Sequence, residues 1–307
     1  MSEIKMPIFR RIANAIINKT APLWSDRLFL QVKGRIKLGY KLNLDNPRSF
    51  NEKINWLKLN HKDESLTRLV DKYAVKEYVA SIIGVEHVIP TLAVYDKAED
   101  IDFDKLPQQF VLKCTHDSGG IVVCKDKNKC TSYPGFIKDK NKLDKTKVVK
   151  MLHNALKRNF IALTREYPYK NVTPRIIAEQ YMEDEYGELR DYKVFCSEGK
   201  PWMMFIASNR QTGLANFNFY DMEFNLLPIL NGHPKAPFQI DKPKSFDKML
   251  DLASKLSKGF IHVRVDFYDI NGHLYFGELT FFHNSGLESI QPVEWDYKMG
   301  EYIHLPQ

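Results

Sequence analysis

The sequence predicts an α+β protein made of more than one compact unit. The chain has 307 residues, which is enough for two or three units with apolar cores, and 44% of its residues are hydrophobic. Segments with the two-residue period of strands alternate with segments that have the period of helices. They do so without the regular strand–helix–strand rhythm of one doubly wound sheet, which favours separate α+β units.

The N-terminal region is predicted to be helical. Residues 7–19 place Ile8, Ile12 and Ile16 on one face of a helix, with several basic residues nearby. Such a basic amphipathic pattern is typical either of a helix packed on its own domain or of a helix that lies on a membrane surface.

Two further helices are predicted before the first strand. Ser49 is followed three residues later by Glu52, which is the capping-box pattern at the start of a helix. A second helix is expected through residues 71–83, ending at Gly84 because glycine commonly terminates helices.

Strands and helices are expected to alternate over the middle of the chain. The predicted strands are residues 88–96, 110–114, 121–124, 175–182, 189–196 and 201–208. The predicted helices are residues 147–162 and 246–260. Residues 210–243 are rich in asparagine and proline, so we expect a loop there.

A hairpin is predicted over residues 263–282, and it carries charges among its apolar residues. Arg264 and Asp266 share one face of the first strand. A plain two-residue Asn-Gly turn would pair Glu278 with Val265, whereas a longer loop or a single bulge would place Asp266 and Glu278 on one face. The two carboxylates would then form a divalent-cation site, because close carboxylates repel unless they are neutralised. The alternative is a solvated outer face.

A strand and a loop of small residues indicate a second candidate site. Lys113 lies on the strand, and Ser118, Gly119 and Gly120 follow in the loop before the next apolar strand. Backbone amides of such a loop can close over phosphates, and the lysine supplies a positive charge. The P-loop and dinucleotide-binding glycine motifs are absent.

The strand at 175–182 and its successor form a third candidate site. Backbone groups around Glu179 and Tyr181 would suit an adenine edge, while Asp191 and Lys193 share a face of the next strand. Asp191 would accept hydrogen bonds from ribose hydroxyls, and Lys193 would bind a phosphate. The alternative is a surface strand with alternating charge.

The order of these segments resembles the ATP-grasp superfamily of carboxylate–amine ligases. The segments NPRSFNEKINWLKL, DKYAVKEYV, FVLKCTHDSGG, DYKVFC and RVDFYDINGHLYFGELTF resemble its TupA-like branch, over residues 40–306. The resemblance implies an ATP-grasp fold, in which two α+β subdomains clamp ATP next to a helical N-terminal region. The implied domains are a helical region (1–88), a lid with the phosphate loop (89–178) and a core with the metal site (179–307).

The resemblance also implies roles for single residues. Those expected to bind ATP are Lys72, Lys113, Ser118, Gly119, Gly120, Glu179, Tyr181 and Asp191. Lys193 joins them by strand parity alone. Arg264 and Lys113 would be catalytic, and Asp266 and Glu278 would hold magnesium. The family ends its metal strand in Glu-x-Asn, whereas this chain has Thr280 at the last position, so Thr280 or Asn284 would replace the missing ligand.

The activity implied by the resemblance is amide formation through an acyl phosphate, with ATP and magnesium as cofactors. The TupA-like branch is associated with bacterial teichuronopeptide, capsule and lipopolysaccharide synthesis. This implies that an amine or amino acid is joined to a uronic acid of a surface polysaccharide. The net charge of +7 suits an acidic acceptor, and no nucleic-acid partner is expected.

The sequence leaves other functions open. Asp102 and Asp104 form a D-x-D string, which would suit a metal-dependent glycosyltransferase; a phosphotransferase and a non-catalytic binding protein are further alternatives. The four cysteines fit no paired metal-ligand spacing and agree with reduced thiols. We expect a cytoplasmic protein; if the acceptor is lipid-linked, the N-terminal helix would contact the inner membrane leaflet.

Overall fold

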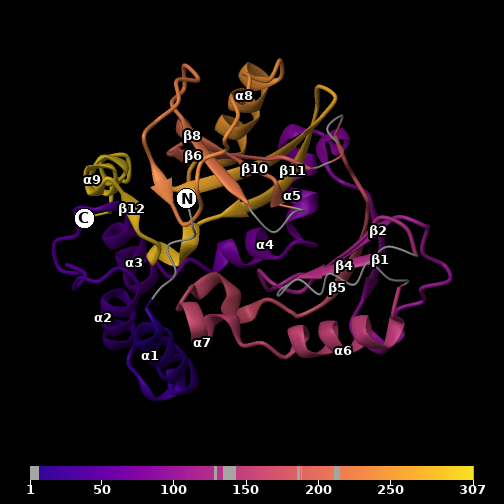
Figure 1. Cartoon of the computed structure of the whole chain (residues 1–307), viewed down its shortest axis with the longest axis horizontal. Coiled ribbons are helices and arrows are strands. Elements are labelled where there is room, and N and C mark those ends of the chain that lie inside the picture. Colours follow the sequence, from indigo (N-terminus) through magenta and orange to yellow (C-terminus); the bar gives the residue numbers. More distant parts are fainter. Residues whose placement is uncertain are drawn as a thin grey trace. The chain divides into compact units, whose positions relative to one another are not determined.

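Contacts divide the chain into two compact units (Figure 1). The computed structural model describes residues 7–127, 130–133, 143–184, 187, 189–210 and 215–306. Unit 1 comprises Met1–Glu64, Ile161–Tyr167 and Asp184–Gln307, and unit 2 comprises Ser65–Phe160 and Pro168–Glu183. These boundaries differ from the predicted divisions after residues 88 and 178.

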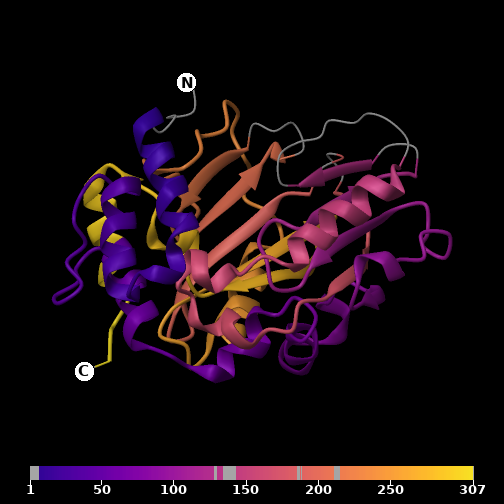
Figure 2. The same cartoon turned by 90° about the horizontal axis from the view of Figure 1, so that it is seen from below.

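Four helices of unit 1 come from the two ends of the chain (Figures 1 and 2). They are α1 (Ile8–Lys19), α2 (Asp26–Lys37), α3 (Phe50–Asn60) and α9 (Val293–Glu301). The first three contact one another in sequence order, and α3 also contacts α9. The predicted capping box is confirmed, because Ser49 and Glu52 exchange side chain to backbone hydrogen bonds at the start of α3. Helices α2 and α9 are not among the predicted elements.

Unit 1 also contains a five-stranded antiparallel sheet in the order β11-β10-β6-β7-β8. Its strands are β6 (Asp191–Ser197), β7 (Lys200–Ser208), β8 (Asn216–Tyr220), β10 (Val263–Ile270) and β11 (His273–Thr280). Helix α8 (Phe246–Ser257) packs against β6, β7 and β10. The buried side chains of Met249, Leu252 and Leu256 cover that face of the sheet.

Residues 210–243 were expected to be a loop, and this prediction is wrong for two segments. Strand β8 pairs with β7, and the short β9 (Leu230–Asn231) pairs with β12 (Ile290–Gln291). The asparagines of β8 are buried, and they bind the segment that follows: Asn218 accepts from the amide of Ala236, and Asn216 donates to the carbonyl of Lys235. The polar composition therefore reflects buried hydrogen bonds. Residues 211–214 lie outside the described residues.

The register of the β10–β11 hairpin decides where its charges point. The turn has two residues with positive φ, and it pairs Phe267 with Phe276. A bulge then shifts the register, so Asp266 lies opposite Glu278 and Arg264 opposite Thr280. The predicted arrangement with both carboxylates on one face is therefore confirmed, through a bulge at Gly277.

Unit 2 is a second five-stranded antiparallel sheet, in the order β1-β5-β2-β3-β4. Its strands are β1 (Thr91–Tyr95), β2 (Phe110–Cys114), β3 (Ile121–Cys124), β4 (Cys130–Tyr133) and β5 (Ile176–Gln180). Helix α6 (Lys145–Leu156) contributes Val148, Leu152 and Ala155 to the apolar core on one face of this sheet. Helices α4 (Thr67–Val70) and α5 (Val75–Ile83) also belong to unit 2, and α5 ends at Gly84 as predicted.

Two other predictions differ from the structure. The helix predicted at 147–162 ends earlier, and a separate short helix, α7 (Phe160–Thr164), follows. Cys124 is disulfide-bonded, so the expectation of four reduced cysteines is wrong for this residue, whereas Cys114 and Cys196 are free and buried. Residues 128–129 and 134–142, within the stretch from 125 to 150 that is rich in lysine, lie outside the described residues. Among the helices that the structure describes, none is long and apolar enough to cross a bilayer.

Candidate functional site

A row of charged side chains lies on the sheet face of unit 1 opposite helix α8. We call it the charged face, and it consists of Asp191, Lys193, Arg264, Asp266 and Glu278. Cross-strand pairing aligns Asp266 with Lys193 on one side and with Glu278 on the other. Because side chains alternate along a strand, the apolar partners Val194, Val265 and Leu279 point to the opposite, helix-covered face. The predicted shared face of these residues is thus confirmed.

Arg264 connects two members of the charged face, Asp266 and Glu278. Its Nε and Nη2 lie 2.7 Å from the two oxygens of Asp266, which is a bidentate ion pair. Nη2 also lies 3.1 Å from Oε1 of Glu278 and 3.0 Å from Oγ1 of Thr280. The guanidinium is 7% exposed, so these contacts fix it in one orientation.

The carboxylates of the charged face suit a magnesium ion. Burial raises the pKa of Asp266 although Arg264 and Lys193 act to lower it, so its negative charge is not fully compensated. The side chain of Glu278 is 41% exposed. Magnesium is usually bound by one or two carboxylates together with substrate phosphates and water. The described residues contain no cluster of three or more metal-ligating side chains, so a magnesium site on Asp266 and Glu278 stays a prediction.

Asp191 and Lys193 form a second charged group at the β6 end of this face. Arg210 forms an ion pair with Oδ2 of Asp191, and Lys193 lies 3.4 Å from the same oxygen and also pairs with Asp266. Burial acts to raise the pKa of Asp191, but Arg210 and Lys193 outweigh it and lower the pKa. Oδ1 of Asp191 is buried and has no hydrogen-bond partner among the described residues, so it can accept a ligand hydroxyl.

His283 was missed by the sequence analysis although it contacts Arg264. Its Nδ1 lies 2.6 Å from Nη1 of Arg264, and its Nε2 lies 2.9 Å from Oδ1 of Asn231. Since that amide oxygen only accepts, Nε2 carries the proton and Nδ1 accepts from the guanidinium. Burial and then Arg264 lower the pKa of His283 well below its ordinary value, which keeps the ring neutral.

Where the resemblance would place an asparagine ligand, this chain has Thr280. Oγ1 of Thr280 accepts from Arg264 and lies 3.2 Å from Oε1 of Glu278. The other candidate ligand, Asn284, is exposed and donates its amide to Asn231. A ligand role for either residue stays a prediction.

In unit 2, Glu179 binds two lysines on the sheet face opposite the α6 core. We call Lys76, Lys113 and Glu179 the Glu179 cluster. The Oε atoms of Glu179 lie 2.5 Å from Lys76 and 2.7 Å from Lys113. Burial acts to raise the pKa of Glu179, but the two lysines outweigh it and lower the pKa, so the carboxylate is ionised.

The two lysines of the Glu179 cluster have different surroundings. Lys76 was not predicted, and its Nζ also binds Ile89 and Thr91, so its hydrogen bonds are satisfied within the protein. Lys113 is 18% exposed, and Glu179 is its acidic partner among the described residues. Lys113 therefore retains donors for an anion such as phosphate.

Contacts of Asp117 fix the conformation of the predicted phosphate loop. Its side chain accepts from the amide of Gly119 and pairs with Arg158 at 2.6 Å, while Nζ of Lys72 donates to its carbonyl at 2.7 Å. Ser118 is exposed at the tip of the loop.

Gly120 is required by packing at the base of this loop. A Cβ there would lie 2.6 Å from Sγ of Cys114 and 2.9 Å from Cβ of Ala155. The role of the loop in phosphate binding stays a prediction, but this close approach explains one of its two glycines.

At two other predicted positions, the side chains bind neighbouring residues of the protein. Tyr181 donates to Glu183 just after β5. In the D-x-D string, Asp102 accepts from the amide of Asp104, and Asp104 pairs with Lys145 at 2.7 Å. The string thus forms a surface turn, which weakens the metal-binding alternative.

The chain is similar to several solved ligase structures. A D-alanine–D-alanine ligase from Bacillus anthracis complexed with ATP is 16% identical, with 69% of this chain and 53% of that chain covered and a TM-score of 0.37. The enzyme of that name from Helicobacter pylori is 15% identical, with 84% and 69% covered and a TM-score of 0.45. An L-amino acid ligase from Bacillus licheniformis is 10% identical, with 92% and 58% covered and a TM-score of 0.37. The chain thus spans little more than half the length of the first and third of these proteins.

Sequence comparison assigns the family. No curated protein matches the chain. A family model described as TupA-like ATP-grasp matches residues 52–304, which is most of the chain and agrees with the resemblance of its motifs. The chain belongs to the TupA-like ATP-grasp family.

Proposed function

We propose that this protein is an ATP- and magnesium-dependent carboxylate–amine ligase. It transfers the γ-phosphoryl group of ATP to a carboxylate, and an amine then attacks the acyl phosphate to give an amide, ADP and phosphate. Family membership supports the use of ATP. The observation that carries the proposal is the bulged hairpin, which places Asp266 and Glu278 opposite each other with Arg264 bonded to both.

The candidate residues of both units have roles in this proposal. Lys72, Lys113 and the loop with Ser118, Gly119 and Gly120 bind phosphates. Glu179 and Tyr181 lie at the adenine, and Asp191 and Lys193 bind the ribose and a phosphate. Bound magnesium supplies positive charge that neutralises the triphosphate, and Asp266 and Glu278 hold it.

Arg264 stabilises the phosphoryl group in transfer. Its guanidinium is held by several partners before any substrate binds, so little reorganisation is needed when negative charge develops. No nucleophile from the protein is required, which agrees with the buried state of the free cysteines.

The acid substrate is proposed to be a uronic acid of a bacterial surface polysaccharide, such as a capsule, an O-antigen or teichuronopeptide. The amine donor is an amino acid or an amino sugar. The net charge of +7 supports an acidic acceptor.

A hydroxylamine assay tests the reaction. The full chain is incubated with ATP, magnesium, galacturonate or glucuronate oligomers and a panel of amines, and ADP is measured with and without hydroxylamine. Acceptor-dependent ADP release with hydroxamate formation is expected, because hydroxylamine traps an acyl phosphate. Asp266→Asn should abolish both.

Other results would contradict the ligase. A stable phosphorylated sugar without hydroxamate would identify a phosphotransferase. Transfer from a UDP-sugar without ATP, unaffected by Asp266→Asn, would identify a glycosyltransferase. ATP binding without any turnover would leave a binding protein.

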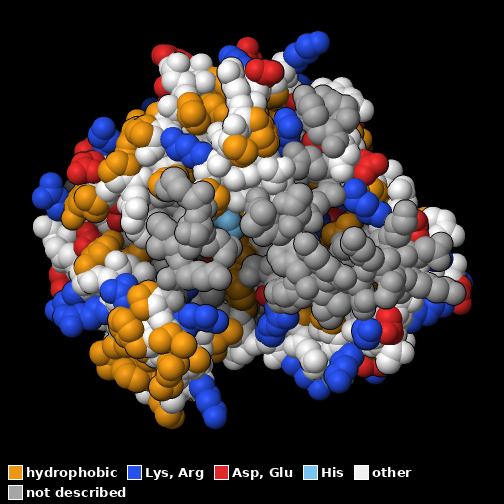
Figure 3. Space-filling model, viewed as in Figure 1, with side chains coloured by type: hydrophobic (Ala, Val, Ile, Leu, Met, Phe, Trp, Pro, Cys, Tyr) orange, Lys and Arg blue, Asp and Glu red, His pale blue; other side chains and the backbone are white. Residues whose placement is uncertain are grey.

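A membrane-surface contact through α1 belongs to the same proposal. Helix α1 contacts α2 through the buried Ile17, whereas Ile8, Ile12 and Ile16 are 75%, 57% and 59% exposed. Figure 3 shows this hydrophobic patch over α1 with Lys and Arg side chains at its margin. An apolar helix face flanked by basic residues fits an anionic lipid surface, where a lipid-linked acceptor would be found.

Vesicle sedimentation tests this contact. Phosphatidylglycerol vesicles should sediment the protein, and phosphatidylcholine vesicles should do so less. Replacing Ile8, Ile12 and Ile16 by serine should abolish binding. Replacing Val85, Leu226 and Val293, which are exposed elsewhere, should not. Equal loss in both triple variants would contradict the proposal.

A further inference from the structure

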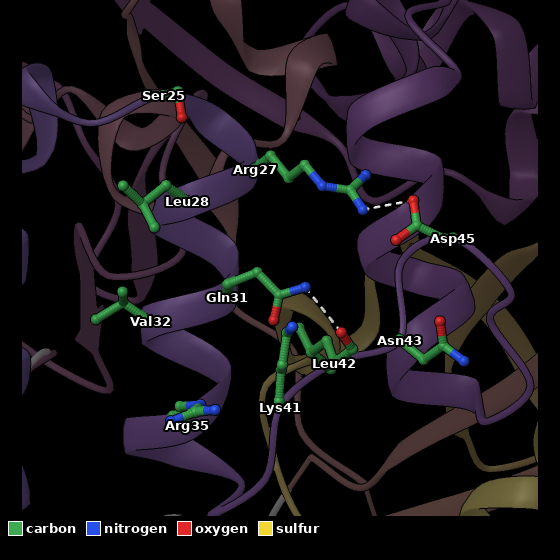
Figure 4. A pocket seen from close by; sticks show the side chains of 10 residues that line it. All are labelled: Ser25, Arg27, Leu28, Gln31, Val32, Arg35, Lys41, Leu42, Asn43 and Asp45. Carbon is green, nitrogen blue, oxygen red and sulfur yellow. Dashed lines mark hydrogen bonds and ion pairs between the residues drawn. The ribbon is translucent and has the colours of Figure 1, made fainter.

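A groove of about 670 Å³ lies beside helix α2 in unit 1 (Figure 4). Its walls are α2 on one side and residues 41–45 on the other, and Arg27, Gln31, Arg35 and Lys41 are among the side chains that line it. This volume falls within the range of small-molecule sites, roughly 300–1,000 Å³. None of the residues assigned to ATP or magnesium lines it, so it is separate from the charged face.

The groove carries an excess of positive charge. Three basic side chains and one acidic side chain line it. Arg27 pairs with Asp45 at 2.6 Å, whereas Arg35 and Lys41 form no ion pair with any residue that the structure describes. Two positive charges are thus available to an anionic ligand.

The groove also has a fixed, unsatisfied hydrogen-bond acceptor. Nε2 of Gln31 donates to the carbonyl of Leu42 at 2.8 Å, which fixes the orientation of the amide. The other amide atom, Oε1, is buried and has no donor among the described residues. Figure 4 shows the Gln31 side chain extending from α2 toward residues 41–43, next to Lys41. A ligand group that donates, such as a hydroxyl, could satisfy this oxygen, whereas a simple anion could not.

Apolar side chains complete the groove. Leu28 and Val32 line it one helical turn apart, and Leu28 is 51% exposed. A saccharide that carries carboxylates would match all three features of the groove. Its carboxylates would pair with the basic side chains, its hydroxyls would donate to the free acceptor, and its apolar C–H surface would contact the apolar side chains.

We propose that the α2 groove binds an acidic saccharide, a sugar chain with both hydroxyl and carboxylate groups. This inference rests on the proposed function, because such a chain is the acceptor assigned to the ligase. The groove would hold a stretch of the polymer away from the reacting carboxylate, which would raise the local concentration of that carboxylate.

Calorimetry on the full chain without ATP tests the groove. The probe is tetragalacturonate, and the comparison ligands are the neutral maltotetraose and tetrapolyphosphate, which has charge but no hydroxyl pattern of a sugar. Tetragalacturonate is expected to bind at least tenfold more tightly than either. Binding needs no turnover, so this result is independent of the ligase activity.

Charge-reversal variants locate the binding. Lys41→Glu and, separately, Arg35→Glu should each weaken tetragalacturonate binding at least tenfold. The matched control is Lys248→Glu on α8, which makes the same change in net charge at another exposed lysine and should leave the affinity unchanged. All three substituted residues are exposed, and unchanged thermal unfolding would confirm that the variants are folded.

Several results would overturn the inference. Equal weakening by Lys248→Glu would show a general attraction to a basic protein. Equal affinity for tetrapolyphosphate would show an anion patch without saccharide recognition. Loss of phosphatidylglycerol vesicle binding in Lys41→Glu, with tetragalacturonate binding intact, would assign the groove to lipid headgroups. A ligase active on uronates with unchanged KM in both groove variants would also refute it.

Discussion

Arg264 is buried, and its donors are distributed over the side chains of Asp266, Glu278, Thr280 and His283. The donors of a buried guanidinium need acceptors, because a buried charge without partners strongly destabilises the folded state. His283 supplies the partner for Nη1, and Asn231 fixes the tautomer that makes this possible. We therefore regard His283 as a positioning residue for Arg264.

Two substitutions of His283 separate positioning from folding. His283→Leu leaves Nη1 of Arg264 unpaired, at a cost of about 1–3 kcal/mol, so kcat should fall roughly tenfold or more. His283→Asn restores an acceptor near the position of Nδ1 and should recover part of the loss. The KM for ATP should change less than kcat in both variants. Equal kcat in the two variants would contradict this role.

Lys33 predicts a pH dependence of stability. Burial, helped by Lys37 and Arg165, lowers its pKa from 10.5 to about 8. Between these values the unfolded state binds more protons, so the free energy of unfolding rises with pH because of this residue. Lys33→Met removes that dependence. The difference in unfolding free energy, wild type minus variant, should rise by up to about 3 kcal/mol from pH 8 to 10.5.

Urea unfolding at several pH values measures this difference. Tyrosines and cysteines also titrate in that range, but they are common to both proteins and cancel in the comparison. A difference that stays constant with pH would show that Lys33 is charged in the folded state throughout.

Residues of the candidate site differ in how far the sequence could predict them. The shared face of Arg264 and Asp266, and that of Asp191 and Lys193, follow from strand parity, which is a local property of each segment. His283 and Asn231 are far apart in sequence and meet only in the folded unit, so no spacing rule connects them. The same holds for Lys76 and Glu179, which lie on different elements of unit 2.

At the scale of elements, the β10–β11 bulge determines the site. The turn alone would have set a register with Glu278 opposite Val265, and the extra residue, Gly277, shifts it by one. A Cβ on Gly277 would lie 3.2 Å from the carbonyl oxygen of Asp266 and 3.4 Å from the ring of Tyr268. The absence of a side chain therefore lets the two strands approach each other at the carboxylate pair.

Gly277→Ala should move Asp266 and weaken the metal site. We expect a loss of about 1–2 kcal/mol in unfolding free energy, as for other overpacked positions, together with weaker magnesium-dependent ATP binding. Gly272→Ala is the matched control. Its cost is similar because φ is 86°, but nothing lies within 4 Å of the added Cβ. Unchanged magnesium dependence in Gly277→Ala would contradict the role of the bulge.

The elements that the sequence predicted have strong local signals. Helix α3 has its capping box, α5 has its terminal glycine, and the hairpin has its turn. Helix α2 contains Gly34, which weakens helix propensity but is needed because a Cβ would lie 2.9 Å from Leu42. Tertiary packing thus overrides the local preference in α2, and sequence reasoning alone does not detect it.

At the scale of the whole molecule, the two units are built from the chain in different ways. Unit 1 combines segments from both ends, and contacts such as the amide of Asn51 with Asp296 join residues that are 245 positions apart. Unit 2 is nearly continuous, from residue 65 to residue 183, apart from Ile161–Tyr167. Because unit 2 is a compact and nearly continuous stretch with its own apolar core, we expect it to fold without the rest of the chain.

The fragment 65–183 should therefore fold as an independent domain. It contains all five strands of its sheet and helix α6, with a core that includes Leu112 and Leu152. A cooperative thermal transition with dispersed amide NMR signals is expected. Leu112→Ala removes a fully buried side chain and should cost about 2–5 kcal/mol, whereas Leu92→Ala, at a 41% exposed position, should cost much less. A fragment without a cooperative transition, or one equally sensitive to both substitutions, would show that unit 2 depends on the rest of the chain.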